Sequence, residues 1–270
     1  MDRTTFQPGM QLDPSKPDEN STWQMTLETL TSELSETGIA QAYIRQFAAF
    51  LFSAVYNHFP LFLIGPSGHT IADALSVSLF ATTAGTLDAS IPYDAKYLHD
   101  ADQSSDQIIT VENIFSGNWL IPLTGHIQNT HKFFIFLHPF PEDLQIEPHS
   151  LFRCIHPIFT EIILDFVKKP DFLGGKNIEN YTQFESKNGK PSGSVLTGIP
   201  ATHLYTDRLL KVIADAYQML GSEDEDSAFL LGAFPYTYAI GRNDIIQEKL
   251  NSHSSISKYT RQRIDEFLKA

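Results

Sequence analysis

A short segment near residue 65 combines glycines, hydroxyls and an imidazole in a pattern that could bind phosphate. Phosphate-binding loops of the form G-x-x-x-x-G-K-[ST] cradle phosphates with backbone N–H groups, reach the outer phosphates with lysine and bind magnesium through a hydroxyl. The candidate binding residues are Gly65, Ser67, Gly68, His69 and Thr70. Compared with the full pattern, about three residues are missing, and the lysine is one of them. We therefore expect no resident cofactor, or weak ATP or GTP binding without efficient hydrolysis.

Polar residues also follow two apolar runs further along the chain. Glu112 and Asn113 follow the run 108–111, and His138 follows the run 133–137. Such runs are typical of buried parallel strands, and ligand sites in open parallel sheets lie at the carboxyl ends of the strands. We therefore expect these polar side chains to lie beside the loop that begins at residue 65.

Two of these side chains limit the chemistry. An imidazole such as that of His69 can replace a lysine only when protonated, and its ordinary pKa is about 6.5. The amide of Asn113 cannot act as a base, whereas a glutamate at that position could polarise a water molecule. The pattern favours a site that has kept its framework and lost its hydrolytic groups.

The order of these segments resembles the AAA+ family of P-loop ATPases. In that family a Gly-Pro-x-Gly loop opens a helix with small and apolar residues, as 71–75 does here. A second apolar strand ends in Asp-Glu in the family, whereas here Glu112 and Asn113 follow it. The family's sensor strand commonly ends in Asn, and here His138 stands at that place.

The resemblance continues towards the C-terminus. Residues 141–159 resemble the family's stretch from sensor loop to arginine finger, which makes Arg153 the candidate interface residue. A helical region follows, like the family's lid. The resemblance implies an α/β, parallel-sheet P-loop NTPase-like (AAA+-like) core with a small C-terminal helical lid domain. It also implies a non-catalytic pseudo-ATPase, a subunit or adaptor whose protein partners are active AAA+ ATPase subunits or copies of itself.

Composition shifts and periodicity predict four regions. We expect a flexible N-terminal arm over 1–20, the α/β core over 21–173, an exposed insertion or linker over 174–200 and the helical lid over 201–270. The expected strands are 61–64, 108–111, 133–137 and 161–166. The expected helices are 22–34, 39–58, one capped at Thr70, 204–220, 228–239, 244–250 and 257–268.

Charge and composition narrow the classes of partner. The chain carries 19 Lys and Arg against 32 Asp and Glu, a formal charge of −13, which repels phosphate backbones and anionic membranes. We therefore expect neither direct nucleic-acid nor membrane binding. The most apolar stretch, 39–64, is interrupted by polar residues, which favours a buried helix and strand over a membrane-spanning helix. One cysteine excludes an intramolecular disulfide, and a polar first segment lacks the apolar run of an export signal, so we expect a cytoplasmic protein.

Two other functions fit the same residues. The loop also nearly matches the nucleophile elbow G-x-S-x-G of α/β-hydrolases, in which Ser67 would be the nucleophile, although His69 replaces the last glycine. A nucleotide-binding sensor that does not hydrolyse its ligand is the other alternative. None of the ten histidines has the paired spacing of a metal site, so we expect no metal.

Overall fold

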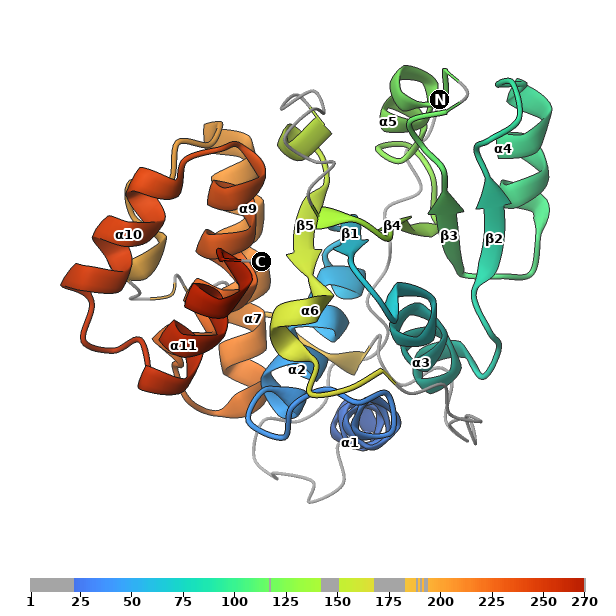
Figure 1. Cartoon of the computed structure of the whole chain (residues 1–270). Helices are drawn as coiled ribbons and strands as arrows, with labels where there is room; N and C mark the ends of the chain where they lie inside the picture. Colours follow the sequence, from blue (N-terminus) through green and yellow to red (C-terminus); the bar gives the residue numbers. More distant parts are fainter. Residues whose placement is uncertain are drawn as a thin grey trace.

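A five-stranded, all-parallel sheet forms the centre of the molecule in the computed structural model, which describes residues 22–116, 118–141, 151–167, 183–187, 189, 191 and 194–269. The strand order is β2-β3-β4-β1-β5, which places the first strand between the last two (Figure 1). The strands are β1 Leu61–Ile64, β2 Gly85–Asp88, β3 Ile108–Glu112, β4 Phe133–His138 and β5 His156–Phe159. The fold class is therefore α/β.

The predicted strands at the centre of the sheet are confirmed, whereas the two edge strands, β2 and β5, were not predicted. β1, β3 and β4 match the apolar runs, because central strands of a parallel sheet are buried on both faces. The strand predicted over 161–166 is wrong, because a short helix, α6 Thr160–Ile163, begins there and the strand precedes it. Sequence periodicity also missed β2, in which Leu87 alone is buried.

Three helices in the first part of the chain pack against one another beside the sheet. They are α1 Thr22–Ser35, α2 Ile44–Tyr56 and α3 Gly68–Phe80. α3 also packs on β3 and β4. The helix predicted over 39–58 begins at Ile44 instead. Ile39 forms an antiparallel bridge with Leu164, and the chain turns between this bridge and the helix.

The remaining connections of the sheet are short. α4 Ala95–Gln103 lies between β2 and β3, and α5 Leu120–His126 lies between β3 and β4. The 3₁₀ turn η2 Leu151–Arg153 leads into β5. Among the described helices, none has both the length and the apolar character needed to cross a membrane.

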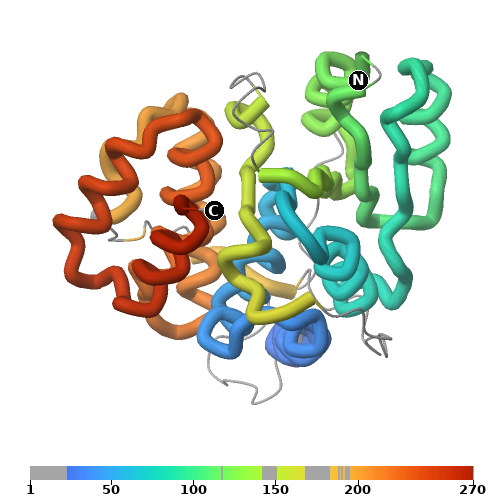
Figure 2. The backbone as a smooth tube through the Cα atoms, in the orientation of Figure 1, coloured from blue at the N-terminus to red at the C-terminus, as the bar shows by residue number. Residues whose placement is uncertain are grey.

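The C-terminal part of the chain is helical and lies at the β5 end of the sheet (Figure 2). The helix α7 (His203–Leu220) packs on α2, and the helix α9 (Phe234–Ala239) packs on β5. The predicted helices 204–220, 244–250 and 257–268 are confirmed with shifted ends. The helix predicted over 228–239 instead contains a π-helical turn, η5. The elements are α7 His203–Leu220, α8 Glu225–Ala228, η5 Phe229–Ala233, α9 Phe234–Ala239, α10 Asn243–Ser252 and α11 Lys258–Phe267.

A fully buried histidine at the start of β5 joins the sheet to these helices. His156 Nε2 lies 2.6 Å from the carbonyl oxygen of Leu231, so this nitrogen donates. Nδ1 then accepts from the Tyr205 hydroxyl at 2.5 Å. Pro235 has no N–H to give to the Leu231 carbonyl four positions earlier. Burial lowers the pKa of His156 to about 4, so its ring is neutral near pH 7.

The domain boundaries stay predictions. One hydrophobic core runs continuously from the first helices to the C-terminal helices. Of the segment predicted as an insertion over 174–200, Phe184 is buried, and its ring packs edge-on against Trp23 at 5.4 Å and Tyr56 at 5.1 Å. The predicted arm over 1–20 lies outside the described residues.

Candidate functional site

The loop after β1 is short, and two of its residues have positive φ angles. Only residues 65–67 separate the strand from α3. Gly65 has a φ of 108° and its N–H donates to the carbonyl of His138 at 2.8 Å. Ser67 has a φ of 67° and occupies the N-cap position of α3 without a side-chain capping bond. The prediction that Thr70 caps this helix is wrong, because α3 begins at Gly68 and Thr70 lies inside its first turn.

Thr160, directly after β5, holds this loop in place. Its buried hydroxyl lies 2.5 Å from the carbonyl oxygen of Pro66 and 3.2 Å from that of Ile64. A Cβ atom at Gly65 would lie 2.8 Å from the same hydroxyl, so both the φ angle and the contact require glycine there. The loop conformation is therefore fixed from two sides, by the strand before it and by Thr160.

The imidazole of His69, in the first turn of α3, contacts the carboxylate of Glu112 at the end of β3. His69 Nε2 lies 2.7 Å from Glu112 Oε1, and their side chains are 54% and 33% exposed. The parallel sheet brings these residues together as predicted, because β1 and β3 both end at this edge. The basic side chain that follows the loop therefore contacts the carboxylate at the end of β3.

Asn113 turns away from the loop and towards β2. Its backbone has a φ of 56°, and its amide donates to Asp88 Oδ1 at 2.9 Å. This bond and those from Ser90 hold the pKa of Asp88 below its usual range, so Asp88 is ionised. Asn113 thus orders the end of β2.

His138 borders the loop through its backbone. Its carbonyl accepts from Gly65, and its ring lies among aromatic side chains, 5.4 Å from Phe115 and 6.2 Å from Phe62. It therefore helps to shape the loop. Gly68 is also close to this strand, since a Cβ atom there would lie 3.1 Å from Leu137 Cδ2.

Arg153 lies at the opposite edge of the sheet. It ends the 3₁₀ turn before β5, and Leu61 of β1 pairs with His156 in the sheet, so Arg153 precedes the amino ends of the strands. Its exposed side chain shares no site with the loop within this chain. The segment 142–150 of the predicted sensor-to-finger stretch lies outside the described residues.

The hydroxyl of Ser67 is buried and has no hydrogen-bond partner among the described residues. A serine nucleophile needs a base within hydrogen-bond distance, and no described histidine bonds to this hydroxyl. The same hydroxyl lies at the N-terminus of a helix, where N–H groups and the helix dipole favour an anion.

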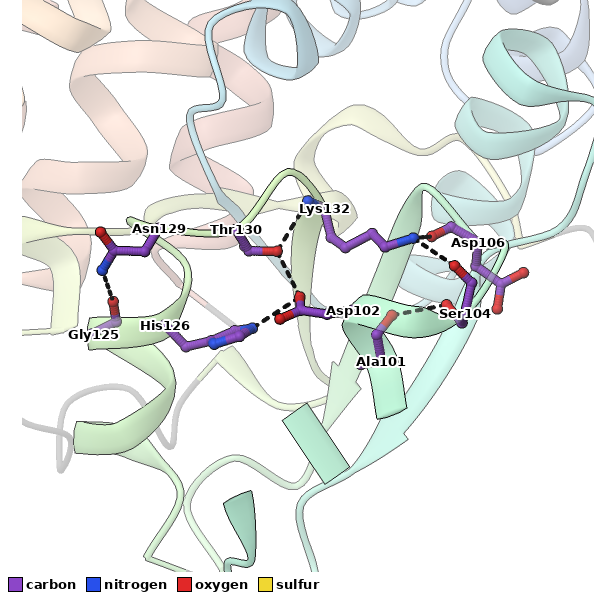
Figure 3. Close-up of polar contacts among 9 residues, drawn as sticks. All are labelled: Ala101, Asp102, Ser104, Asp106, Gly125, His126, Asn129, Thr130 and Lys132. Carbon is purple, nitrogen blue, oxygen red and sulfur yellow. Dashed lines mark hydrogen bonds and ion pairs between the residues drawn. The ribbon is translucent and has the colours of Figure 1, made fainter. Parts of the chain in front are cut away.

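A second group of polar contacts lies at the amino-terminal edge of the sheet (Figure 3). Asp102 Oδ1 lies 3.1 Å from His126 Nε2 and accepts from the Thr130 hydroxyl at 2.7 Å. The Lys132 ammonium donates to two backbone carbonyls in the loop before β3, at 2.7 and 2.8 Å. These bonds tie together the loops that enter β3 and β4, and they leave the Lys132 ammonium engaged with the backbone.

Two cavities lie away from the loop. One, of about 710 Å³, is lined mainly by α1 and α2, and the other, of about 450 Å³, lies beside the end of α7. In the described part of the chain, no three His, Cys, Asp or Glu side chains gather in a way that could hold a metal ion.

Comparisons with known proteins add no identification. No protein-family model matches the chain, and a search of curated proteins finds no match either.

Sequence reasoning missed Thr160 and Asp88, which both order this edge. Thr160 was hidden by the wrong strand over 161–166, although a polar residue after the apolar pair Ile158 and Phe159 was the available signal. Asp88 follows an edge strand that has no apolar run. No signal in the sequence pairs His69 with Glu112 specifically.

Proposed function

We propose that this chain is a non-catalytic, AAA+-like protein, with a P-loop-type core and a helical lid, that acts as a subunit or adaptor in a protein complex. Its partners are active ATPase subunits or copies of itself. The arrangement of the sheet supports this proposal, because β1 lies between β4 and β5, and its loop opens α3 at the carboxyl edge where nucleotides bind. The single cysteine fits a reducing compartment, and we place the protein in the cytoplasm.

The ion pair between His69 and Glu112 carries the non-catalytic part of the proposal. Phosphoryl transfer depends on fixed positive charge around the outer phosphates. His69 is the nearest basic side chain on the loop, and its nitrogen already contacts a carboxylate. A triphosphate at this place would therefore meet Glu112, a negative charge, where a lysine is needed.

The backbone adds to this deficit. Residues 65–67 replace a longer cradle, Pro66 has no N–H, and the N–H of Gly65 is bonded to His138. Fewer amides remain to contact phosphate than in a full loop. The site thus lacks both parts of a phosphate cradle, the cation and most of the donors.

Affinity purification of the tagged full chain from its source cells, followed by gel filtration and mass spectrometry, tests the adaptor role. We expect the chain to elute in a stable complex with stoichiometric protein partners. A chain that elutes as a free monomer under mild conditions contradicts the proposal.

A nucleotide sensor is the second candidate, and the unpaired hydroxyl of Ser67 at the N-terminus of α3 favours it. Titration calorimetry with Mg-ATP and Mg-GTP separates the two candidates. The sensor requires binding heat that a Ser67→Asp variant loses, because a carboxylate there repels phosphate. Binding heat that remains in the variant would mean that the nucleotide binds away from this loop.

The hydrolase alternative receives no support from the geometry. The hydroxyl of Ser67 is buried, and no described base contacts it. A fluorophosphonate probe that labels Ser67 in the folded protein would restore this alternative.

A further inference from the structure

Arg208 on α7 is a fixed and partly buried cation. Its guanidinium carbon lies 5.0 Å over the ring of Phe59, and Nη2 donates to the backbone carbonyl of His58 at 2.5 Å. His58 presents this carbonyl from a left-handed backbone conformation, with a φ of 47°. The side chain is partly buried, and this burial lowers the pKa of Arg208. The remaining guanidinium N–H groups are held in a defined orientation by these contacts.

Among the residues that the structure describes, this cation has no anionic partner. Arg242 and Arg263 show the usual arrangement, since each lies within 3.0 Å of an aspartate oxygen. In the described ranges, no carboxylate forms an ion pair with Arg208 or with Arg153. A partly desolvated charge without a counter-ion is costly. The position of Arg208 therefore favours an anion supplied from outside the chain.

Arg153 ends the 3₁₀ turn that leads into β5, close in sequence to His156, which bonds to Tyr205 of α7. It is close enough to Tyr236 for its charge to oppose the burial that raises the pKa of that tyrosine. The ring of Tyr236 is 4.5 Å from that of Tyr205, and the next residue after Arg153, Cys154, lies near Arg208. One arginine thus comes from the segment before β5 and the other from α7, and both lie near this tyrosine pair.

The kind of anion follows from the surroundings. A nucleic-acid backbone needs a broad basic surface, whereas this chain carries a net charge of −13 and offers two arginines here. The tyrosine rings at the junction are buried, so they cannot stack on bases. Guanidinium groups match carboxylates in two-point hydrogen bonds. A short acidic stretch of a protein satisfies both arginines without bringing a long run of negative charge to the surface.

We propose that Arg153 and Arg208 bind carboxylates of an acidic peptide segment on a protein partner, across the junction between the sheet and the C-terminal helices. This inference rests on the proposed adaptor role, which makes the partner a protein. It assigns the partner's chemistry and places its contact at the edge of the sheet opposite the loop. Binding there would bridge the α/β core and the lid.

Fluorescence anisotropy with a short labelled peptide that carries two glutamates tests the inference at physiological ionic strength, where long-range repulsion by the net negative charge of the chain is screened. We expect saturable binding to the full chain. Because hydrogen bonds to charged groups contribute about 1.5–3 kcal/mol, Arg153→Gln and Arg208→Gln are each expected to weaken binding roughly ten-fold or more. Arg208→Lys keeps the charge but loses the two-point geometry, so we expect an intermediate loss.

The matched control is Arg242→Gln, which removes an exposed arginine already paired with Asp244 and is expected to leave peptide binding unchanged. Arg153 is exposed, so its variant remains a valid test even if Arg208→Gln does not fold. No binding, or binding that both glutamine variants retain, would overturn the proposal. Tighter binding of a polyphosphate chain of equal charge would also overturn it, by assigning a phosphate ligand. Neither arginine contacts the loop, so these outcomes leave nucleotide binding and complex formation as separate tests of the proposed function.

Discussion

The polar contacts at the two ends of β5 differ in burial. Those at the amino end are fully buried, and the pair of His69 and Glu112 beyond the carboxyl end is partly exposed. At its amino end, His156 is fully buried and both ring nitrogens are bonded. Beyond its carboxyl end, Thr160 fixes the loop before α3, and His69, in the first turn of α3, is half exposed and contacts the partly exposed Glu112. Buried polar groups are costly to leave unpaired, whereas exposed pairs contribute little. We therefore expect the contacts of His156 with the C-terminal helices to stabilise the fold, whereas the pair of His69 and Glu112 can change without unfolding it.

Replacing His156 is the largest test of this difference. His156→Ala removes both hydrogen bonds, leaves the Leu231 carbonyl and the Tyr205 hydroxyl buried without partners, and opens a cavity. We expect a loss of about 4 kcal/mol in the free energy of unfolding, measured by urea denaturation. His203→Ala is the control, because His203 is exposed and pairs with Asp207 four residues away, and we expect a change within about 0.5 kcal/mol. Equal losses in both variants would remove the distinction between the two regions.

The pH dependence of stability gives the next largest effect. The pKa of His156 is lowered by burial from 6.5 to about 4 in the folded chain, so between these values the unfolded chain holds the extra proton. The contribution of neutral His156 to the free energy of unfolding is complete above pH 6.5 and is lost as the pH falls towards 4. The stability advantage of wild type over His156→Ala should fall by about 3 kcal/mol across this window. An advantage that does not change with pH would contradict a buried, neutral His156.

Glycine in the loop provides a smaller test. Gly65→Ala meets both an unfavourable φ of 108° and the Thr160 hydroxyl at 2.8 Å, and we expect a loss of about 2–3 kcal/mol. Gly221→Ala is the control, since its φ is 72° and no atom lies within 4 Å of the new Cβ. That variant is expected to lose about 1 kcal/mol. The difference between the two variants measures the contact with Thr160, and equal losses would show that Thr160 does not restrain the loop.

The exposed pair of the loop gives the smallest expected effect. His69→Ala and Glu112→Gln should each change the free energy of unfolding by no more than about 0.5 kcal/mol, because water replaces the lost partner. The double variant should equal the sum of the single variants within a similar margin. A loss as large as that of His156→Ala would mean that the pair is structural.

The sequence predicted the parts of the fold whose signal is local. β1, β3 and β4 are apolar along their length because both of their faces are buried, and α7 shows its helical period clearly. Edge strands carry no such signal. Pro157 and His156 concealed β5, and the mixed composition of β2 concealed that strand.

The site was predictable only in part for the same reason. Parallel topology places the ends of β1 and β3 at one edge, so the proximity of His69 and Glu112 follows from the strand assignment. The bond between His156 and Leu231 does not, because these residues are 75 positions apart in the sequence. The roles of Thr160 and Asp88 likewise arise from tertiary contacts.

Steady-state turnover of Mg-ATP and Mg-GTP by the purified full chain tests the central claim most directly, since that claim is a shortage of positive charge at the loop after β1. We expect phosphate release no faster than that of a Ser67→Asp variant, with or without Glu112→Gln. Sustained turnover that Glu112→Gln or His69→Ala abolishes would contradict the account, because it would show that the paired side chains separate and support phosphoryl transfer.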